Sequence, residues 1–166
     1  MNARPVLDRI VHALADCRLE VILIGNAGAA LQGAPVTTLD FDFLFRKTPV
    51  NVKKLKALAT ALGGSVFRPY YPVSSLYRLM ADEDNLQLDF MPMVHGIKSF
   101  ESARSRATEV RMPGGRLLVA SLPDIVRSKR AAGRPKDIAV LPILEATLDE
   151  LEARSREAGA AKKKTR

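Results

Sequence analysis

Three aspartates stand at positions where they could hold a divalent metal ion. Asp40 and Asp42 flank Phe41, and Asp89 lies further along, inside the apolar run 86–91. Residues two apart on a strand point to the same face, so Asp40 and Asp42 are expected to share one. Carboxylates gathered on one face repel one another unless a cation joins them. These residues predict a site for Mg²⁺ or Mn²⁺, in which Asp89 either completes the coordination or accepts the proton of an attacking hydroxyl.

A glycine turn precedes these aspartates. The aliphatic run 21–24 is typical of a buried strand, and Gly25-Asn26 ends it before a short helix expected over residues 27–32. Backbone N–H groups at the start of a helix point into such a turn and can bind an anion. An anion site beside a metal site is what a substrate phosphate requires, because magnesium usually completes its coordination with phosphate oxygens and water.

Basic residues are concentrated after the aspartates. The 166-residue chain has a net charge of +8, and residues 101–136 carry nine Lys or Arg against three Asp or Glu. Residues 137–160 reverse the balance, with six acids and two bases. The distribution predicts a basic face near the carboxylates and an acidic, solvated helix behind it. Arg127, Lys129, Arg130 and Arg134 are candidates for a nucleic-acid or phosphate footprint, with a solvated helix face as the alternative.

The remaining elements must position these residues. Hydrophobic spacing predicts helices over 4–18, 53–62, 121–132 and 135–156, with a kink or break at Pro142. Strands are expected over 21–24, 39–45, 65–71, 76–80, 86–91, 108–112 and 116–120, with a turn at Pro72. The length suits one domain over residues 1–157, followed by a disordered basic tail over 158–166.

Several classes of protein are disfavoured by composition. No apolar run approaches the ~20 residues of a membrane span, and charged residues interrupt the first ten positions, so we expect a cytoplasmic protein. Cys17 is the only cysteine, which excludes an internal disulfide and a cysteine-based zinc cluster.

Together, these motifs resemble a known superfamily. Gly25-Asn26, the pair Asp40-Phe-Asp42 and the later Asp89 are similar to the pattern of the nucleotidyltransferases, and residues 22–43 resemble the small bacterial members of abortive-infection and toxin–antitoxin type. The segment 128–137, which ends in Lys136-Asp137, is similar to their C-terminal Lys-Asp segment. The resemblance implies an α/β (α+β) nucleotidyltransferase fold, a mixed twisted sheet flanked by helices. It also implies transfer of a nucleoside monophosphate from an NTP to an acceptor.

The resemblance also implies roles for particular residues. Gly25 and Asn26 would lie against the triphosphate, and Asp40, Asp42 and Asp89 would be the catalytic and metal-binding acids. Lys136 would reach the triphosphate or a substrate carboxylate, with Asp137 orienting it. Asn26 stands where the family usually has Gly or Ser. An Asn amide can still donate to a phosphate oxygen, and Asn tolerates unusual backbone angles. Thr37, Thr38 and Gln32 are further candidates for substrate contact, and His95 lies in the loop after Asp89.

Three functions compete on this basis. The first is a metal-dependent nucleotidyltransferase acting on tRNA or a protein, with an antitoxin as a partner. The second modifies a small molecule such as an aminoglycoside, but such enzymes usually have an extra helical domain and little of this chain remains after residue 137. The third is a non-catalytic module of the same fold that binds nucleic acid or a protein partner through its basic face.

Overall fold

The chain is built on one mixed β-sheet. The computed structural model describes residues 3–38, 40–69, 75–82 and 85–164, and side chains within residues 5–160 of these ranges. Its seven strands have the order β3-β4-β5-β2-β1-β7-β6. Their bounds are β1 (Val21–Ile24), β2 (Phe41–Phe45), β3 (Gly64–Phe67), β4 (Tyr77–Ala81), β5 (Leu86–Met91), β6 (Thr108–Met112) and β7 (Gly115–Val119).

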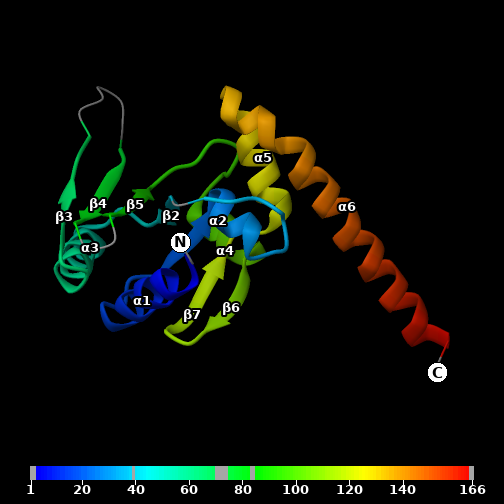
Figure 1. Cartoon of the computed structure of the whole chain (residues 1–166), viewed down its shortest axis with the longest axis horizontal. Coiled ribbons are helices and arrows are strands. Elements are labelled where there is room, and N and C mark those ends of the chain that lie inside the picture. The colour runs from blue at the N-terminus through cyan, green and yellow to red at the C-terminus, as the bar shows by residue number, and fades with distance from the viewer. Residues whose placement is uncertain (1–2, 39, 70–74, 83–84, 165–166) are drawn as a thin grey trace.

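Six helices accompany these strands in the described ranges (Figure 1). They are α1 (Ala3–Asp16), α2 (Gly25–Ala30), α3 (Pro49–Ala61), α4 (Phe100–Arg106), α5 (Leu122–Ala132) and α6 (Pro135–Lys164). At the centre of the sheet β2 pairs in parallel with β5 and antiparallel with β1, and β1 pairs in parallel with β7. The prediction of a mixed sheet flanked by helices is therefore confirmed.

The sheet separates two hydrophobic clusters, because successive side chains of a strand point to opposite faces. On one face the aromatic rings of Phe43, Phe45 and Phe90 pack with side chains of α1 and α3. On the other face Ile22, Ile24 and Leu44 pack with side chains of α4, α5 and α6. Asp42 is the register partner of Ile24 and so points to this second face, which α4, α5 and α6 cover in part.

The largest departure from the sequence-based expectations is at the C-terminus. Helix α6 continues to Lys164 and so includes residues 158–164, where the sequence predicts a disordered tail. Pro142 lies inside this helix, and the helix continues past it without a break. The tail residues are mostly Ala and Lys, which have high helix propensity. They extend α6, which packs against α5. Figure 1 shows the second half of α6 leading away from the sheet.

Smaller differences affect the site. Strand β2 begins at Phe41 rather than at residue 39, so Asp40 precedes the strand, and α2 begins at Gly25 rather than after Asn26. Helix α4 was not expected; Ser99 caps it by accepting a hydrogen bond from the N–H of Ser102 at 3.1 Å. The predicted turn at Pro72 lies outside the described residues. None of the helices described is both long and apolar enough to cross a bilayer.

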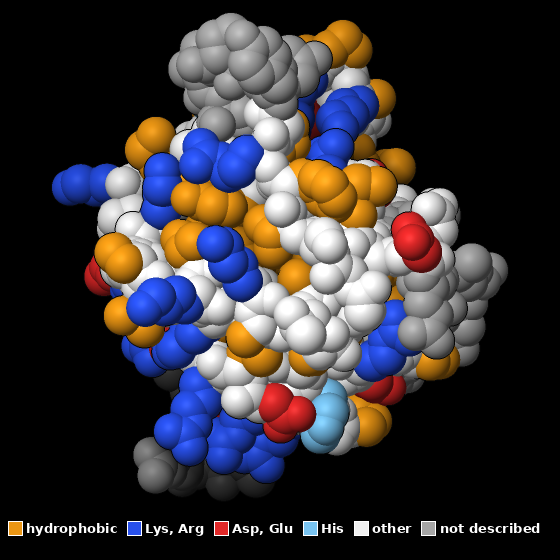
Figure 2. All heavy atoms as spheres, turned by 90° about the vertical axis from the view of Figure 1, so that its left-hand side faces the viewer, with side chains coloured by type: hydrophobic (Ala, Val, Ile, Leu, Met, Phe, Trp, Pro, Cys, Tyr) orange, Lys and Arg blue, Asp and Glu red, His pale blue; other side chains and the backbone are white. Residues whose placement is uncertain are grey.

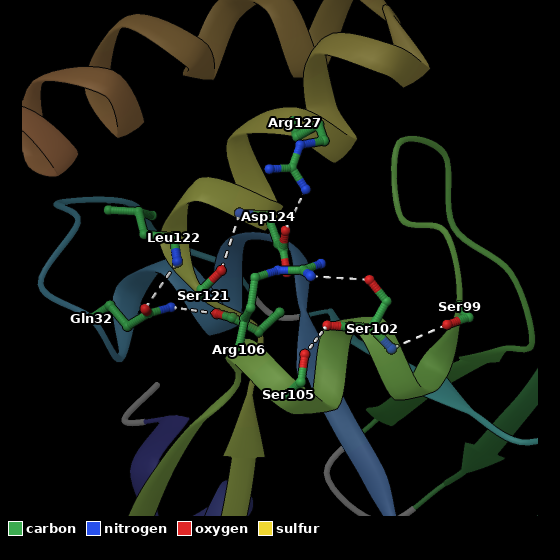
Figure 3. A network of polar contacts seen from close by, with 10 residues as sticks. Gln32, Ser99, Ser102, Ser105, Arg106, Ser121, Leu122, Asp124 and Arg127 are labelled. Carbon is green, nitrogen blue, oxygen red and sulfur yellow. Dashed lines mark hydrogen bonds and ion pairs between the residues drawn. The ribbon is translucent and has the colours of Figure 1, made fainter.

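A buried carboxylate anchors α5 to α4 (Figure 3). Asp124 is 0% exposed; Arg106 donates to its Oδ2 at 2.9 Å and Arg127 donates to its Oδ1 at 2.6 Å. Next to it, the Gln32 side chain donates to the carbonyl of Ala120 and accepts from the N–H of Leu122. Gln32 is thus a clamp between α2 and the start of α5, and not the substrate contact that its sequence position suggests.

Removing the two cations should destabilise the fold more than removing the acid. The Arg106→Ala/Arg127→Ala double variant leaves a buried carboxylate unpaired, and we expect it to lower the free energy of unfolding by about 3–5 kcal/mol. Asp124→Ala should lower it by only about 1–3 kcal/mol, because both guanidinium groups are partly exposed and can turn to water.

Urea denaturation measures this difference. Arg154→Ala is the matched control, since its exposed pair with Glu150 should contribute about 0.5 kcal/mol or less. Equal losses for the double variant and for Asp124→Ala would contradict this account of the anchor.

Candidate active site

Two of the predicted acids lie side by side in the sheet. Asp42 of β2 is the register partner of Asp89 of β5 in a parallel pair. Adjacent strands are about 4.8 Å apart, and partners in register place their side chains on the same face. The prediction that Asp89 joins the Asp40-Asp42 segment in space therefore agrees with the register.

Asp89 is already paired with a cation that was not predicted from the sequence. Arg78 of β4 is its register partner on the other side. Its Nε donates to Oδ1 of Asp89 and its Nη2 donates to Oδ2, both at 2.8 Å. Each carboxylate oxygen keeps a second lone pair, so this bidentate contact orients Asp89 without using all of its acceptor capacity.

Asp40 and Thr38 form the approach to β2. Thr38 Oγ accepts a hydrogen bond from the N–H of Asp40 at 3.1 Å, and Asp40 is exposed. Thr38 therefore shapes the turn before the strand. Because Asp40 precedes β2, the alternation of side chains along a strand does not fix the direction of its side chain. The position of its carboxylate therefore depends on this turn.

Asp42 has the most unusual electrostatic environment of the three. Burial raises the pKa of its carboxyl to about 6, and the negative charges of Asp89 and Asp40 add to the effect. Lys136 and Lys129 act in the opposite direction. The charges of the two lysines thus only partly offset the burial of Asp42 and the negative charges beside it.

The glycine turn lies directly against Asp42. Gly25 has φ +68°, and a Cβ at this position would be 2.8 Å from Oδ2 of Asp42. The backbone can approach the carboxylate this closely because glycine has no side chain. Next to it, Oδ1 of Asn26 is buried and receives no hydrogen bond from the residues that the structure describes. The side chain that departs from the family pattern therefore has a buried polar atom without a described partner.

A cleft of about 730 Å³ opens beside these groups. Its floor includes Gly25 and Asp42, and one wall is the loop of residues 91–99, which includes His95. Further lining comes from α5 and from the segment that leads into α6, with Lys129, Arg134 and Asp137. This volume lies in the range of small-ligand sites in proteins.

The C-terminal Lys-Asp segment supplies a buried acid, but its partners differ from the prediction. Asp137 is 0% exposed. It accepts hydrogen bonds from Arg134 at 2.6 Å and from Lys129 at 3.2 Å. Although burial acts to raise the pKa of Asp137, these hydrogen bonds outweigh it and hold that pKa below its usual value. Among the described contacts Asp137 thus orients Lys129 and Arg134, whereas Lys136 is exposed.

Lys129, one of the four basic residues that the sequence offers as a phosphate footprint, lines the cleft. Its side chain is only 11% exposed. It follows Ile125 by four residues and precedes Ala132 by three, so all three share one face of α5 and line the cleft together. Arg134 also lines the cleft, whereas Arg127 contacts Asp124 and Arg130 contacts Glu145, and neither is among the lining residues.

The three aspartates do not form a ready-made metal cage. Within the described part of the chain, no three Asp, Glu, His or Cys side chains are grouped closely enough to hold a metal ion. Two features explain this: Arg78 holds both oxygens of Asp89, and Asp40 precedes the strand. Metal binding by Asp40, Asp42 and Asp89 stays a prediction.

Comparison with solved structures identifies the fold. This chain is similar to ANT(2'')-Ia in complex with adenylyl-2''-tobramycin, with a TM-score of 0.64, 18% identity and coverage of 95% of this chain and 99% of that one. For the lincosamide antibiotic adenylyltransferase LnuA, lincomycin-bound, the TM-score is 0.62 at 13% identity, covering 89% and 98%. For an antigenic nucleotidyltransferase-like protein from Paracoccidioides brasiliensis it is 0.55 at 16% identity, covering 95% and 90%. No protein-family model and no curated protein matches the sequence.

The chain therefore has the nucleotidyltransferase fold, as the sequence resemblance predicts.

Neutralising Asp42 should stabilise the protein above pH 6. Because the folded-state pKa of about 6 exceeds the ordinary value of 3.8, the stability that Asp42 contributes is fully present below pH 3.8 and is lost as the pH rises through 6. Asp42→Asn removes this loss. We expect the variant to gain about 3 kcal/mol in free energy of unfolding at pH 7.5 relative to wild type, and only about 0.5 kcal/mol at pH 4.

Urea titrations of both proteins between pH 4 and pH 8 test this expectation. Asp82→Asn, which changes an exposed acid in a turn, is the control and should show no such pH-dependent gain. A constant difference between Asp42→Asn and wild type across this range would contradict the proposed origin of the shift.

Proposed function

We propose that this protein is a metal-dependent nucleotidyltransferase that transfers a nucleoside monophosphate from an NTP to a hydroxyl of an acceptor. The observation that supports this most directly is the pairing of Asp42 with Asp89 in the register of β2 and β5, beside the Gly25 turn and the cleft. The cleft is lined by the Asp42 carboxylate and by two cations, Lys129 and Arg134. Such a distribution suits a metal-bound triphosphate.

The residues present fit a divalent cation. Asp42 lacks positive charge, its neighbours Asp40 and Asp89 are acids, and all three offer the hard oxygen ligands that Mg²⁺ and Mn²⁺ take. Bound there, the metal would stabilise the charge that develops on the phosphate oxygens. Asn26 follows Gly25 in the chain, and its amide N–H could donate to a phosphate.

The reaction assigns a task to each side chain. The acceptor hydroxyl oxygen attacks the α-phosphorus of the NTP, and the bond from that phosphorus to the bridging oxygen of pyrophosphate breaks. The hydroxyl proton passes to Asp89, which Arg78 holds in place. Pyrophosphate leaves with the negative charge, which Lys129 and Arg134 can balance from the cleft wall, and Lys136 can act from the adjacent surface.

A second candidate is a non-catalytic binding module of the same fold. Its support is the bidentate contact of Arg78, which supplies Asp89 with a positive charge in place of a metal ion. In this case the acids would be a structural ion-pair group, and NTP would not react. The toxin–antitoxin role and an antitoxin partner stay predictions from the sequence resemblance.

Transfer activity distinguishes the two candidates. The protein, incubated with α-labelled NTPs, Mg²⁺ or Mn²⁺ and total RNA, protein or hydroxyl-bearing antibiotics, should label an acceptor. Asp42→Ala should reduce labelling by about 1,000-fold or more, because it removes the ligand nearest the reacting phosphate. Asp149→Ala, an exposed acid on α6, should leave labelling unchanged. Absence of labelling with either metal and all acceptors would favour the binding module.

Two glycines provide a test of the phosphate turn. Gly25 and Gly33 both have positive φ, but only a Cβ at Gly25 would meet Asp42, whereas at Gly33 no atom lies within 4 Å. Each Ala variant should lose about 1–3 kcal/mol of stability from backbone strain. In calorimetry only Gly25→Ala should also lose at least tenfold in affinity for Mn²⁺–ATP. Equal losses of affinity in both variants would show that the Gly25 turn has no specific role in nucleotide binding.

A further inference from the structure

Arg78 lies between two register partners, and only one of them is an acid. Asp89 lies beside it on β5, and Phe67 lies beside it on the edge strand β3. Phe67 is 51% exposed, and Figure 2 shows that hydrophobic and basic side chains are exposed at this end of the molecule. Partners in register present their side chains on the same face, so Asp89 is the acid that Arg78 meets across the strands.

The contact covers both oxygens of Asp89. Nε and Nη2 of Arg78 donate in parallel, each at 2.8 Å, and the Asp89 side chain is only 13% exposed. A magnesium ion lies about 2.1 Å from each ligand oxygen and needs room for about six ligands. At Asp89 it would lie close to the guanidinium, and two positive charges repel strongly where little water screens them. Arg78 therefore competes with a metal ion for Asp89.

A proton makes smaller demands on the same carboxylate. Each oxygen of Asp89 keeps a second lone pair next to its hydrogen bond with Arg78, and one lone pair is enough to accept a proton. The two parallel hydrogen bonds also fix the direction of the carboxylate. An acid held in this way can act as a base toward a hydroxyl that reaches it, while it is a poor metal ligand.

Asp42 is in the opposite situation. Among the described residues, Asp42 lines the cleft and Asp89 does not. The backbone of Gly25 leaves the space beside Oδ2 of Asp42 free, which a Cβ at 2.8 Å would fill. A metal–triphosphate complex in the cleft would therefore meet Asp42 before it meets Asp89.

We propose that Arg78 is a positioning residue that divides the acids between two tasks. By occupying both oxygens of Asp89, it reserves that carboxylate for the proton of the acceptor hydroxyl and leaves the metal ion to Asp42 and Asp40. The proton passes from the hydroxyl oxygen to a free lone pair of Asp89 while that oxygen attacks the α-phosphorus. This division of tasks rests on the proposed function.

Metal binding without an acceptor tests the division in the absence of turnover. The probe is Mn²⁺ with α,β-methylene-ATP, which cannot transfer its nucleotide, and calorimetry with the full chain measures the affinity for Mn²⁺. Arg78→Met frees Asp89 to become a third ligand, so this affinity should rise about 10- to 100-fold. Arg78→Met/Asp89→Asn removes the pair without a change in net charge, and its affinity should stay within about threefold of wild type.

Two further variants are the controls. Asp42→Asn makes the same isosteric change at an acid assigned to the metal, and it should weaken Mn²⁺ binding at least about tenfold. Lys136→Met removes a positive charge that acts on Asp42 from an exposed position, and it should strengthen binding by no more than about fivefold. The proposal is overturned if the double variant loses as much affinity as Asp42→Asn, or if Arg78→Met gains no more than Lys136→Met.

A signal from the wild-type protein decides the question if the Arg78 variants do not fold. The Nε–H group of Arg78 donates to Asp89 at 2.8 Å, and NMR of the protein labelled with ¹⁵N-arginine can identify it through its Overhauser contacts with β5. The signal should persist when Mg²⁺ and α,β-methylene-ATP saturate the protein. Loss of the signal on saturation would mean that a metal ion has displaced Arg78, and it overturns the proposal.

Transfer assays separate this proposal from the proposed function. Labelling of an acceptor that Asp89→Asn abolishes, together with the expected Mn²⁺ affinities, supports both. The expected affinities without any labelling support the division of the acids and contradict catalysis. Labelling by wild type, combined with an Arg78→Met variant that gains no affinity for Mn²⁺, supports catalysis and overturns the role of Arg78. Labelling that Asp89→Asn leaves unchanged also overturns the proposal, because Asp89 is then not the base.

Discussion

The parallel pairing of β2 with β5 is the constraint on which the site depends. It places Asp42 beside Asp89, on a face where burial and like charge together raise the pKa of Asp42 to about 6. Such an arrangement is costly in the absence of a compensating cation. Part of the compensation comes from Arg78 on β4, and part from the lysines near the cleft. The remaining imbalance at Asp42 is what a divalent metal ion would relieve.

Two other aspartates of this fold are buried, but each has cationic partners that Asp42 lacks among the described residues. Asp124 and Asp137 are both fully buried, and each is held by two cationic side chains, so they fix helices and loops in place. Asp42 has no such direct partner among the contacts described. The contrast separates structural acids from the candidate functional one: the first two are satisfied within the protein, and the third has capacity for a ligand.

The two sides of Asp42 differ in character. Toward α5 the surface is a concave cleft with cations, which suits a nucleotide triphosphate; toward β3 it is a flat sheet surface with an exposed aromatic ring. The solved structures with this fold include enzymes whose names refer to antibiotics, at 13–18% identity. At such identity the fold alone is shared.

Local sequence determined much of this protein. The aliphatic run of β1, the alternation of β5 and the glycine at position 25 are local signals, so the strands, the turn and the three acids were predictable. Two results depended on tertiary structure: the contact of Arg78 with Asp89, and the burial of Lys129 against Asp137. Strand order and register decide the first, and the packing of α5 on α6 decides the second. Neither contact can be predicted from a fixed spacing in the sequence, because each joins residues that become neighbours only when the sheet and its helices have assembled.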